Sequence, residues 1–552
     1  MKNLTVAMLL LGIVGCANNE NFQTNKYQLK HESKLYTDGY FSSIDAKKNL
    51  TFAKEQYLKM LSNLNTPKLL DSALLCQQAN NICFPRAEVD EKIHMEQPEK
   101  WTNGFFQGVL WQILANKQYI SDFSVEQENE MYENASYFQD AIIGESLRTN
   151  THDLGFLLYD SFGEALRYDG LKLEQQKRYK QALLDGRNSL ATRYSQKNEV
   201  FKSWDWKPKF TTQFIADGTL LKDTFELRQP WAFPVIVDNM MNLEFMLSSD
   251  QQYHHELAYK HAFSTKNNHY FYADSDEDKR FPIAYHVFDY GEHKPGNWQG
   301  LGNVSAWARG QAWSLYGFAT VAEAAKNENS KQSVYTEFQA FTDRLFDSVV
   351  HLTLDDPIPI WDFFANRDDA YHIAENVSNN TAVYSNILNL CDEYIPSTIL
   401  PYKGWRPIQY QASVLAKESY LFLKTVNSIK DEPMIQGDML TPCGTKAYVL
   451  KDRVIPKDTS AAALYAAAAY RLAQFSDNKM RKEEYIEFGD KIMHVLTKHY
   501  LTSKTKDTSF KLGFVLEEAT GNLPNKSEIN TPIVYADFYF IEANIRKIEL
   551  EM

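Results

Sequence analysis

The chain has 552 residues, enough for one large domain or for roughly two to four of ordinary size. Hydrophobic residues make up 44% and charged residues 23%, values that exclude disorder over most of the length. The formal net charge of -13, from 71 acidic and 58 basic residues, argues against binding nucleic acid through its phosphates. Aromatic residues account for 14%, which suits flat ligand-binding surfaces or packing between helices; composition alone favours packing.

The N-terminus has the pattern of an export signal. Lys2 gives a positive start, residues 4–14 are mostly apolar, and Gly15 precedes Cys16. The apolar run is too short to span a membrane as a mature helix, and residues 13–16 resemble a bacterial lipobox. We therefore expect a lipoprotein signal peptide over 1–15 and, from a lipidated Cys16, a polar tether over 16–35. A plain secretory signal is the alternative. We expect a lipid-anchored protein of the bacterial cell envelope, facing the periplasm or the cell surface, with the lipid as its only membrane contact.

Four further cysteines follow, at positions 76, 83, 391 and 443. An exported protein meets an oxidising compartment, so pairing is plausible, and four cysteines allow three pairings. Cys76 with Cys83 is the pair nearest in sequence, which leaves Cys391 with Cys443. Free buried thiols are the alternative, and none of the spacings is typical of a zinc site.

Helical periodicity dominates the rest of the chain. Apolar residues at three- and four-residue spacing predict helices over residues 49–64, 132–146, 173–194, 307–326, 334–352, 413–426, 461–475 and 481–500. Convincing strand patterns are few and short. Many helices of similar length, joined by irregular loops without a clear linker, indicate a single large α-toroid or α-solenoid over residues 36–552.

Two aspartates stand among apolar residues in this pattern. Asp153 lies between His152 and residues 154–156 (LGF), and Asp238 ends the apolar run 233–237. A carboxylate in such a setting either caps a helix or is desolvated, which makes it a usable proton donor near neutral pH. Both interpretations remain open from the residues alone.

One arginine has an unusual setting. Arg309 opens an apolar helix between Trp307 and Trp313. A lone arginine is usually a surface salt-bridge partner, but this one could hold a carboxylate-bearing ligand, because guanidinium matches carboxylate in bidentate fashion. The sequence shows no serine elbow, phosphate loop or dinucleotide fingerprint, and no His/Asp/Glu cluster with metal-ligand spacing.

Six stretches together resemble the unsaturated glucuronyl hydrolases of glycoside hydrolase family 88. They are residues 101–108 (WTNGFFQG), 151–156 (THDLGF), 233–242 (FPVIVDNMMN), 305–313 (SAWARGQAW), 458–463 (DTSAAA) and 531–540 (TPIVYADFYF). The similarity runs in family order from about residue 40 to the end. It implies an all-α fold, the (α/α)6 barrel, in agreement with the helical pattern.

The resemblance also implies a reaction without metal or organic cofactor. The family acts on unsaturated uronic-acid oligosaccharides left by polysaccharide lyases: it hydrates the C4=C5 double bond and releases the sugar as a keto acid. Asp238 is implied as general acid and base, and Asp153 as the second essential carboxylate. The matching substrate-binding positions are Trp101, His152, Trp204, His286, Gln299, Arg309 and Trp313.

The chain departs from the family pattern in two places. About 95 residues separate Trp361 from Asp458 where the family has a short connection, so we expect an insertion at about 364–456 that covers the cleft or decorates the surface. Residues 521–527 lack the serine-and-lysine pattern that some relatives use for sulfated glycosaminoglycans, so ulvan is an equally good source of substrate. An unsaturated rhamnogalacturonyl hydrolase (family 105) and a non-catalytic glycan-binding lipoprotein are the alternatives. The sequence does not indicate an oligomeric state.

Overall fold

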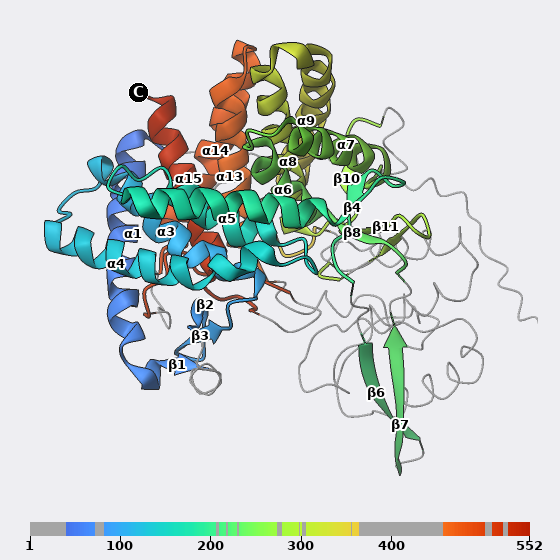
Figure 1. Ribbon diagram of the computed structural model, residues 1–552, viewed down its shortest axis with the longest axis horizontal. Coiled ribbons are helices and arrows are strands. Elements are labelled where there is room, and N and C mark those ends of the chain that lie inside the picture. The colour runs from blue at the N-terminus through green and yellow to red at the C-terminus, as the bar shows by residue number, and fades with distance from the viewer. Residues whose placement is uncertain are drawn as a thin grey trace, which may run out of the picture.

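The computed structural model describes residues 40–71, 82–205, 209–216, 219–228, 231–272, 279–296, 298–300, 305–354, 356–363, 456–502, 511–522 and 528–552. Its helices alternate along the chain between an outer and an inner layer (Figure 1). The outer helices are α1 (Ser43–Leu64), α4 (Val125–Ala141), α5 (Leu173–Ala191), α7 (Gln252–Asn268), α9 (Gln332–Leu352) and α14 (Lys479–His499). The inner helices are α3 (Phe105–Ala115), η5 (Gly155–Gly163), α6 (Asn242–Leu247), α8 (Ala308–Asn327), α13 (Thr459–Phe475) and α15 (Val534–Leu550).

The inner helices form a closed ring. Each packs against the next in the order α3, η5, α6, α8, α13 and α15, and α15 returns to pack against α3. Each also packs against one outer helix: α4 on α3, α5 on η5, α7 on α6, α9 on α8, α14 on α13 and α1 on α15. This is an (α/α)6 barrel, and it confirms the all-α fold that the sequence predicts.

The two ends of the barrel differ in the length of their connections. An inner helix passes to the next outer helix in a few residues, such as 476–478 between α13 and α14. An outer helix passes to the next inner helix through a long segment, such as 192–241 between α5 and α6. Because the chain alternates between the layers, the long segments gather at one end of the barrel, which we call the mouth; the other is the closed end.

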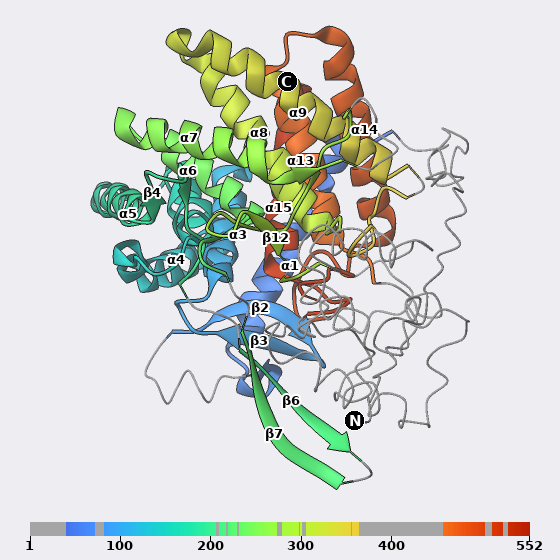
Figure 2. The ribbon, with the colours of Figure 1, turned by 90° about the vertical axis from the view of Figure 1, so that its right-hand side faces the viewer.

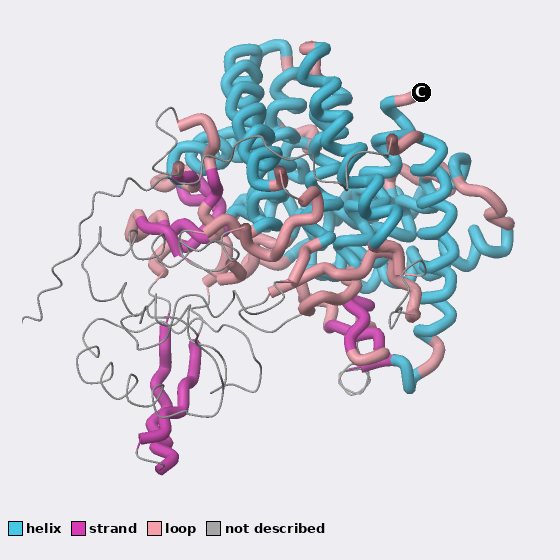
Figure 3. Tube along the Cα trace, turned by 180° about the vertical axis from the view of Figure 1, so that it is seen from behind, coloured by secondary structure: helices cyan, strands magenta, loops and turns pink. Residues whose placement is uncertain are grey.

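The strands lie in the long segments and gather at one side of the helical body (Figures 2 and 3). They pair as β1 (Leu70–Asp71), β3 (Lys92–Glu96) and β2 (Phe84–Val89); β12 (Lys294–Gly296), β11 (Val287–Asp289) and β8 (Pro234–Ile236); β4 (Tyr194–Ser195) with β5 (Val200–Phe201); β6 (Lys209–Ala216) with β7 (Thr219–Arg228); and β9 (Tyr270–Phe271) with β10 (Ile283–Ala284). Strand β8 ends just before Asp238, and strand β11 begins directly after His286. Short 3-10 helices η1 (Pro67–Leu69), η2 (Trp101–Gly104), η3 (Lys117–Tyr119), η4 (Ile143–Leu147), η6 (Val237–Met241) and η7 (Asn329–Lys331) complete the connections.

Two glycines let α3 approach η5 closely. A Cβ at Gly104 would lie 1.8 Å from the carbonyl oxygen of Phe156, and one at Gly108 would lie 2.1 Å from that of Asp160. The two positions are four residues apart, so they lie on one face of the helix. Backbone contact between α3 and η5 therefore fixes the π-helix η5, which begins two residues after Asp153.

Most helix predictions agree with the structure, with informative exceptions. The helix predicted over 132–146 is α4, which begins earlier because Ser124 and Gln127 form a capping box. The predictions miss α3, η5, α6, α7 and α15. In α3 and α15 almost every residue is buried, so the polar face that produces periodicity is missing. The predicted helix 413–426 lies outside the described residues.

Several other predictions also fall partly or wholly outside the described part. The signal peptide, the lipidated Cys16, the tether and the insertion are all in this group. Cys83 is disulfide-bonded, and its partner lies outside the described residues. No helix in the described ranges is long and apolar enough to cross a membrane.

Candidate active site

Asp238 lies in the first turn of η6, where strand β8 reaches the mouth. Its carboxylate is buried, and Oδ2 lies 3.5 Å from Nε2 of His286, longer than an ordinary hydrogen bond. No other described residue donates a hydrogen bond to Oδ2. The residue before η6, Ile236, is its N-cap and makes no side-chain cap bond, so the capping interpretation does not apply to Asp238.

The second ring nitrogen of His286, Nδ1, accepts a hydrogen bond that holds the ring in place. The backbone N–H of Gln299 donates to Nδ1 over 3.2 Å. An amide can only donate, so Nδ1 accepts, and the proton of the neutral ring resides on Nε2, facing Asp238. Burial lowers the pKa of His286, an effect that the nearby Asp238 opposes and Arg309 reinforces. The ring is therefore neutral near pH 7.

Asp153 lies in the loop that leads into η5. Its Oδ2 accepts a hydrogen bond of 2.6 Å from the Thr151 hydroxyl, and its Oδ1 lies 3.2 Å from Nε2 of His152. The side chain is 28% exposed, far more than that of Asp238. The N-cap of η5 is Leu154 without a side-chain cap bond, so Asp153 is not a helix cap either.

A chain of buried amides connects the two aspartate segments. Asn242 Oδ1 accepts the backbone N–H of Gly155 over 2.8 Å, and its Nδ2 donates to Asn239 Oδ1 over 2.7 Å. Asn239 Nδ2 reaches Ser203 Oγ at 3.4 Å, and the Ser203 carbonyl accepts the N–H of His152 over 3.1 Å. The loop that carries Asp153 and the helix that follows Asp238 are therefore held at a fixed separation.

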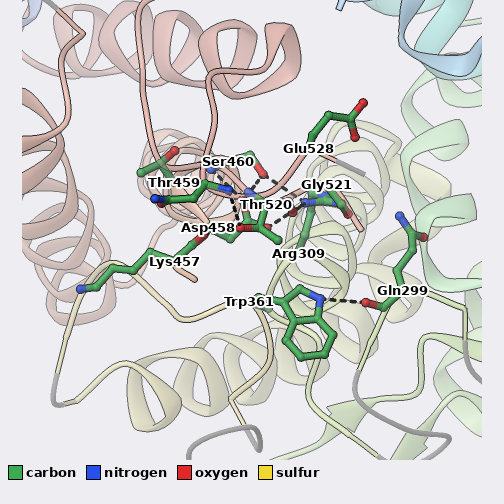
Figure 4. A network of polar contacts seen from close by, with 12 residues as sticks. Gln299, Arg309, Trp361, Lys457, Asp458, Thr459, Ser460, Thr520, Gly521 and Glu528 are labelled. Atoms are coloured by element: carbon green, nitrogen blue, oxygen red, sulfur yellow. Dashed lines mark hydrogen bonds and ion pairs between the residues drawn. The ribbon is translucent and has the colours of Figure 1, made fainter. Parts of the chain in front are cut away.

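Arg309 is anchored at the start of α8 (Figure 4). Its Nη1 donates to Asp458 Oδ2 over 2.8 Å and to the Thr520 carbonyl over 2.6 Å, and its Nη2 donates to the Gly521 carbonyl. Asp458 in turn accepts from the Ser460 N–H. Only Nε of the guanidinium has no hydrogen-bond partner among the described residues. The ion pair with Asp458 fixes the position of the positive charge, and the whole guanidinium is buried.

Aromatic rings line the same region. Trp101 is half-buried and stacks on Tyr535 at 5.2 Å between ring centroids. Phe156 lies 5.3 Å from Trp101 and 5.1 Å from the fully buried Trp313. The Arg309 guanidinium lies 5.1 Å from the Tyr535 ring. Of these rings, only Trp101 is partly exposed.

Two more tryptophans lie between these aromatic rings and the histidines of the site. Trp307 lies 4.3 Å from the His286 ring and 4.7 Å from the Arg309 guanidinium. Trp204 lies 6.1 Å from the His152 ring and is 7% exposed. The structure thus brings the predicted site residues together at the mouth, from segments far apart in the sequence.

Sequence reasoning gave no role to several residues that support the site. Asp458 and Tyr535 stand inside quoted motifs, and their buried contacts with Arg309 explain their presence there. Asn239 and Asn242 also stand inside such a stretch, residues 233–242, and Ser203 stands beside Trp204. Side-chain amides that connect distant loops have no sequence periodicity, so only the fold could identify them.

The arrangement suits proton transfer next to an anionic, ring-shaped ligand. Asp238 offers a buried carboxylate, His286 a neutral donor beside it, and Arg309 a fixed positive charge. Within the described ranges, no group of three or more His, Cys, Asp or Glu side chains is placed to hold a metal ion.

Known proteins resemble the chain along much of its length. The model described as Glycosyl Hydrolase Family 88 matches residues 76–353. An unsaturated glucuronyl hydrolase of Formosa agariphila is 26% identical over 489 residues, covering 86% of each chain. An unsaturated chondroitin disaccharide hydrolase of Streptococcus pneumoniae is 24% identical over 291 residues, 51% of this chain and 62% of the relative. The crystal structure of an unsaturated glucuronyl hydrolase specific for heparin superposes with a TM-score of 0.58 at 24% identity, covering 92% of this chain and 98% of that one.

Proposed function

The chain belongs to glycosyl hydrolase family 88, and from this we propose that it is an unsaturated glucuronyl hydrolase. The observation that carries the proposal is the buried Asp238 carboxylate beside a neutral His286, within the region that the family model matches. The substrates are unsaturated oligosaccharides whose non-reducing sugar is a uronate with a C4=C5 double bond.

The reaction adds the elements of water across that double bond. Asp238, in its acid form, gives a proton to C4, and positive charge develops at C5 next to the ring oxygen. The resulting carboxylate takes a proton from a water molecule, whose hydroxyl bonds to C5. The C5 hemiketal opens to a ketone, C1 becomes a hemiacetal, and its breakdown releases the second sugar. This route differs from direct attack at the glycosidic carbon by paired carboxylates.

The other site residues divide the work of binding. Asp153 acts as the second carboxylate and holds sugar hydroxyls. Trp101, which is partly exposed, stacks on the ring. Arg309 attracts the uronate carboxylate through its fixed charge. The remaining contacts are assigned to His152, Trp204, His286, Gln299 and Trp313.

The barrel also supplies positive potential in an acidic chain. Every inner helix begins at the mouth, so the partial positive charges of their N-termini converge there. The formal net charge of -13 repels an anionic sugar at long range, so these local charges carry its recognition. This arrangement supports a carboxylate-bearing substrate.

Loss of ultraviolet absorbance from an unsaturated disaccharide tests the proposal. The purified protein should bleach the absorbance of at least one lyase product from ulvan, chondroitin, heparin, gellan, xanthan or pectin. Asp238→Asn should lower the rate roughly 10³-fold, because an amide cannot supply the proton. The fold should survive, since Oδ2 makes no hydrogen bond within the described structure.

The exposed Asp205, 54% accessible at the same end of the barrel, provides a matched control. Asp205→Asn should leave the rate unchanged. A folded Asp238→Asn variant that keeps most of the wild-type rate contradicts the acid–base assignment. A wild-type protein that binds the disaccharides without bleaching any of them favours a glycan-binding protein.

We further propose that Cys16 is lipidated and holds the enzyme at the cell envelope. The lipobox pattern of residues 13–16 supports this placement. Cys16→Ser should release the protein from the membrane fraction of the producing bacterium; a variant that stays membrane-bound contradicts the anchor.

A further inference from the structure

Trp361 is a buried residue that touches the site only through other residues. Its side chain is fully buried, and its indole N–H donates to the Gln299 carbonyl over 2.8 Å (Figure 4). Its own backbone is held on both sides: its N–H donates to the Pro456 carbonyl over 2.8 Å, and its carbonyl accepts the N–H of Ala308 over 3.0 Å. The indole is therefore a rigid donor with a fixed direction.

Trp361 holds Gln299, and the backbone of Gln299 determines which ring nitrogen of His286 carries the proton. Gln299 donates its backbone N–H to Nδ1 of His286 over 3.2 Å, while its carbonyl is occupied by Trp361. The two contacts hold the Gln299 backbone on both sides of its α-carbon. The imidazole is packed at 4.3 Å from the Trp307 ring, which limits its rotation.

We propose that Trp361 is a positioning residue that fixes the Nε2–H tautomer of His286 through the backbone of Gln299. In this tautomer the ring presents an N–H to Asp238 Oδ2; in the other it presents a lone pair, which repels a carboxylate. The assignment rests on the proposed function for its catalytic meaning, because it keeps His286 a donor to Asp238 after the proton has left. The groups around His286 are Asp238 on η6, Arg309 on α8 and His152 before η5.

The tautomer itself is measurable on the wild-type protein without substrate. Histidine-selective ¹⁵N labelling distinguishes protonated from unprotonated ring nitrogens, and His286→Gln identifies the signals of His286. The expected result is an unprotonated Nδ1 and a protonated Nε2 at pH 7. A proton on Nδ1 overturns the proposal whether or not the protein proves to be a hydrolase, so the two failures are distinguishable.

Trp361→Phe tests the role of the indole N–H, and Trp111→Phe is its matched control. Trp111 is also fully buried and donates one hydrogen bond, 3.1 Å long, to Gln139, without contact to the site residues. Trp361→Phe should give mixed tautomers at His286 and a fall in kcat of roughly tenfold, with KM within about twofold. Trp111→Phe should change neither the His286 signals nor kcat. A folded Trp361→Phe variant with wild-type signals and wild-type kcat overturns the positioning role; if that variant does not fold, the wild-type spectrum still decides the tautomer.

Discussion

Both ends of the barrel bury polar groups, but the two ends differ in how many of these groups have hydrogen-bond partners within the described structure. At the mouth, several buried polar atoms have no hydrogen-bond partner among the described residues; they are His152 Nδ1, Asp238 Oδ2, His286 Nε2, Trp307 Nε1, Arg309 Nε, Trp313 Nε1 and the Tyr535 hydroxyl. Most buried polar groups in folded proteins are paired, because an unpaired one costs about 1–3 kcal/mol. Seven such exceptions occur together at the mouth, and others lie elsewhere in the described structure, such as Gln112 Oε1 on α3 and Gln339 Oε1 on α9.

The closed end carries a network of comparable size that is already complete. Arg471 donates two hydrogen bonds to Glu244, of 2.8 and 3.0 Å, and one of 2.7 Å to Glu323. Tyr316 donates to Glu542 over 2.6 Å, and Arg546 donates to the same carboxylate over 2.7 Å. These contacts join α6, α8, α13 and α15, so the network holds the inner ring together. The polar groups of this network are paired within the protein, whereas the atoms named at the mouth are not.

Glu244→Gln should produce the largest loss of stability among single changes at the closed end. Burial alone would raise the pKa of Glu244, but the paired Arg471 overrides this and lowers it, so the carboxylate is charged. Removing the charge leaves Arg471 with Glu323 as its acidic partner and should cost about 3 kcal/mol of unfolding free energy. Chemical denaturation measures the loss, and the kcat of the folded variant at 25 °C should stay within about twofold of wild type.

The exposed ion pair between Lys479 and Glu483 provides the control. Its N···O distance is 4.0 Å and both side chains are mostly exposed, so Glu483→Gln should leave the denaturation midpoint almost unchanged. If Glu244→Gln and Glu483→Gln lower the free energy of unfolding equally, the buried network does not stabilise the closed end more than an exposed ion pair does.

Among the described helices, the sequence predicted every outer one except α7, but of the inner ones only α8 and α13. Outer helices such as α9 have one face in contact with solvent, so polar and apolar residues alternate with helical periodicity and the helix can be predicted. The residues that hold the site act through single hydrogen bonds between segments far apart in the chain, as Asn242 does with Gly155 and Trp361 with Gln299. The sequence around a residue does not indicate such a hydrogen-bond partner, because only the folded structure brings the two residues together.

Glu164, directly after η5, should make the free energy of unfolding depend on pH. Burial, together with the nearby Glu542 and Glu244, raises its pKa to about 7, although Arg167 opposes the shift. A carboxyl whose pKa is higher in the folded state stabilises that state below its unfolded pKa of about 4.5, and this stability is lost as the pH rises through 7. Between pH 5 and 8 the loss should be roughly 2 kcal/mol.

Glu164→Gln isolates this contribution from other groups with the same sign, such as Asp537, whose pKa burial also raises to about 7. The wild-type unfolding free energy should fall more steeply from pH 5 to 8 than that of the variant. Parallel pH curves for the two proteins would show that Glu164 does not carry the dependence.

The smallest expected effect compares one substitution at two buried positions. Trp313 and Trp111 are both fully buried, but only the indole N–H of Trp111 has a hydrogen-bond partner among the described residues. Tryptophan-to-phenylalanine removes a similar volume at each site, so the cavity cost is shared and the hydrogen bond makes the difference. Trp111→Phe should be the more destabilising by about 1 kcal/mol, measured by denaturation without substrate. With substrate the order should reverse in KM, because Trp313 packs on Phe156 beside Trp101 at the mouth, whereas Trp111 donates to Gln139 between α3 and α4. If the two variants lose equal stability and keep the same KM, the unpaired groups at the mouth are not reserved for a ligand.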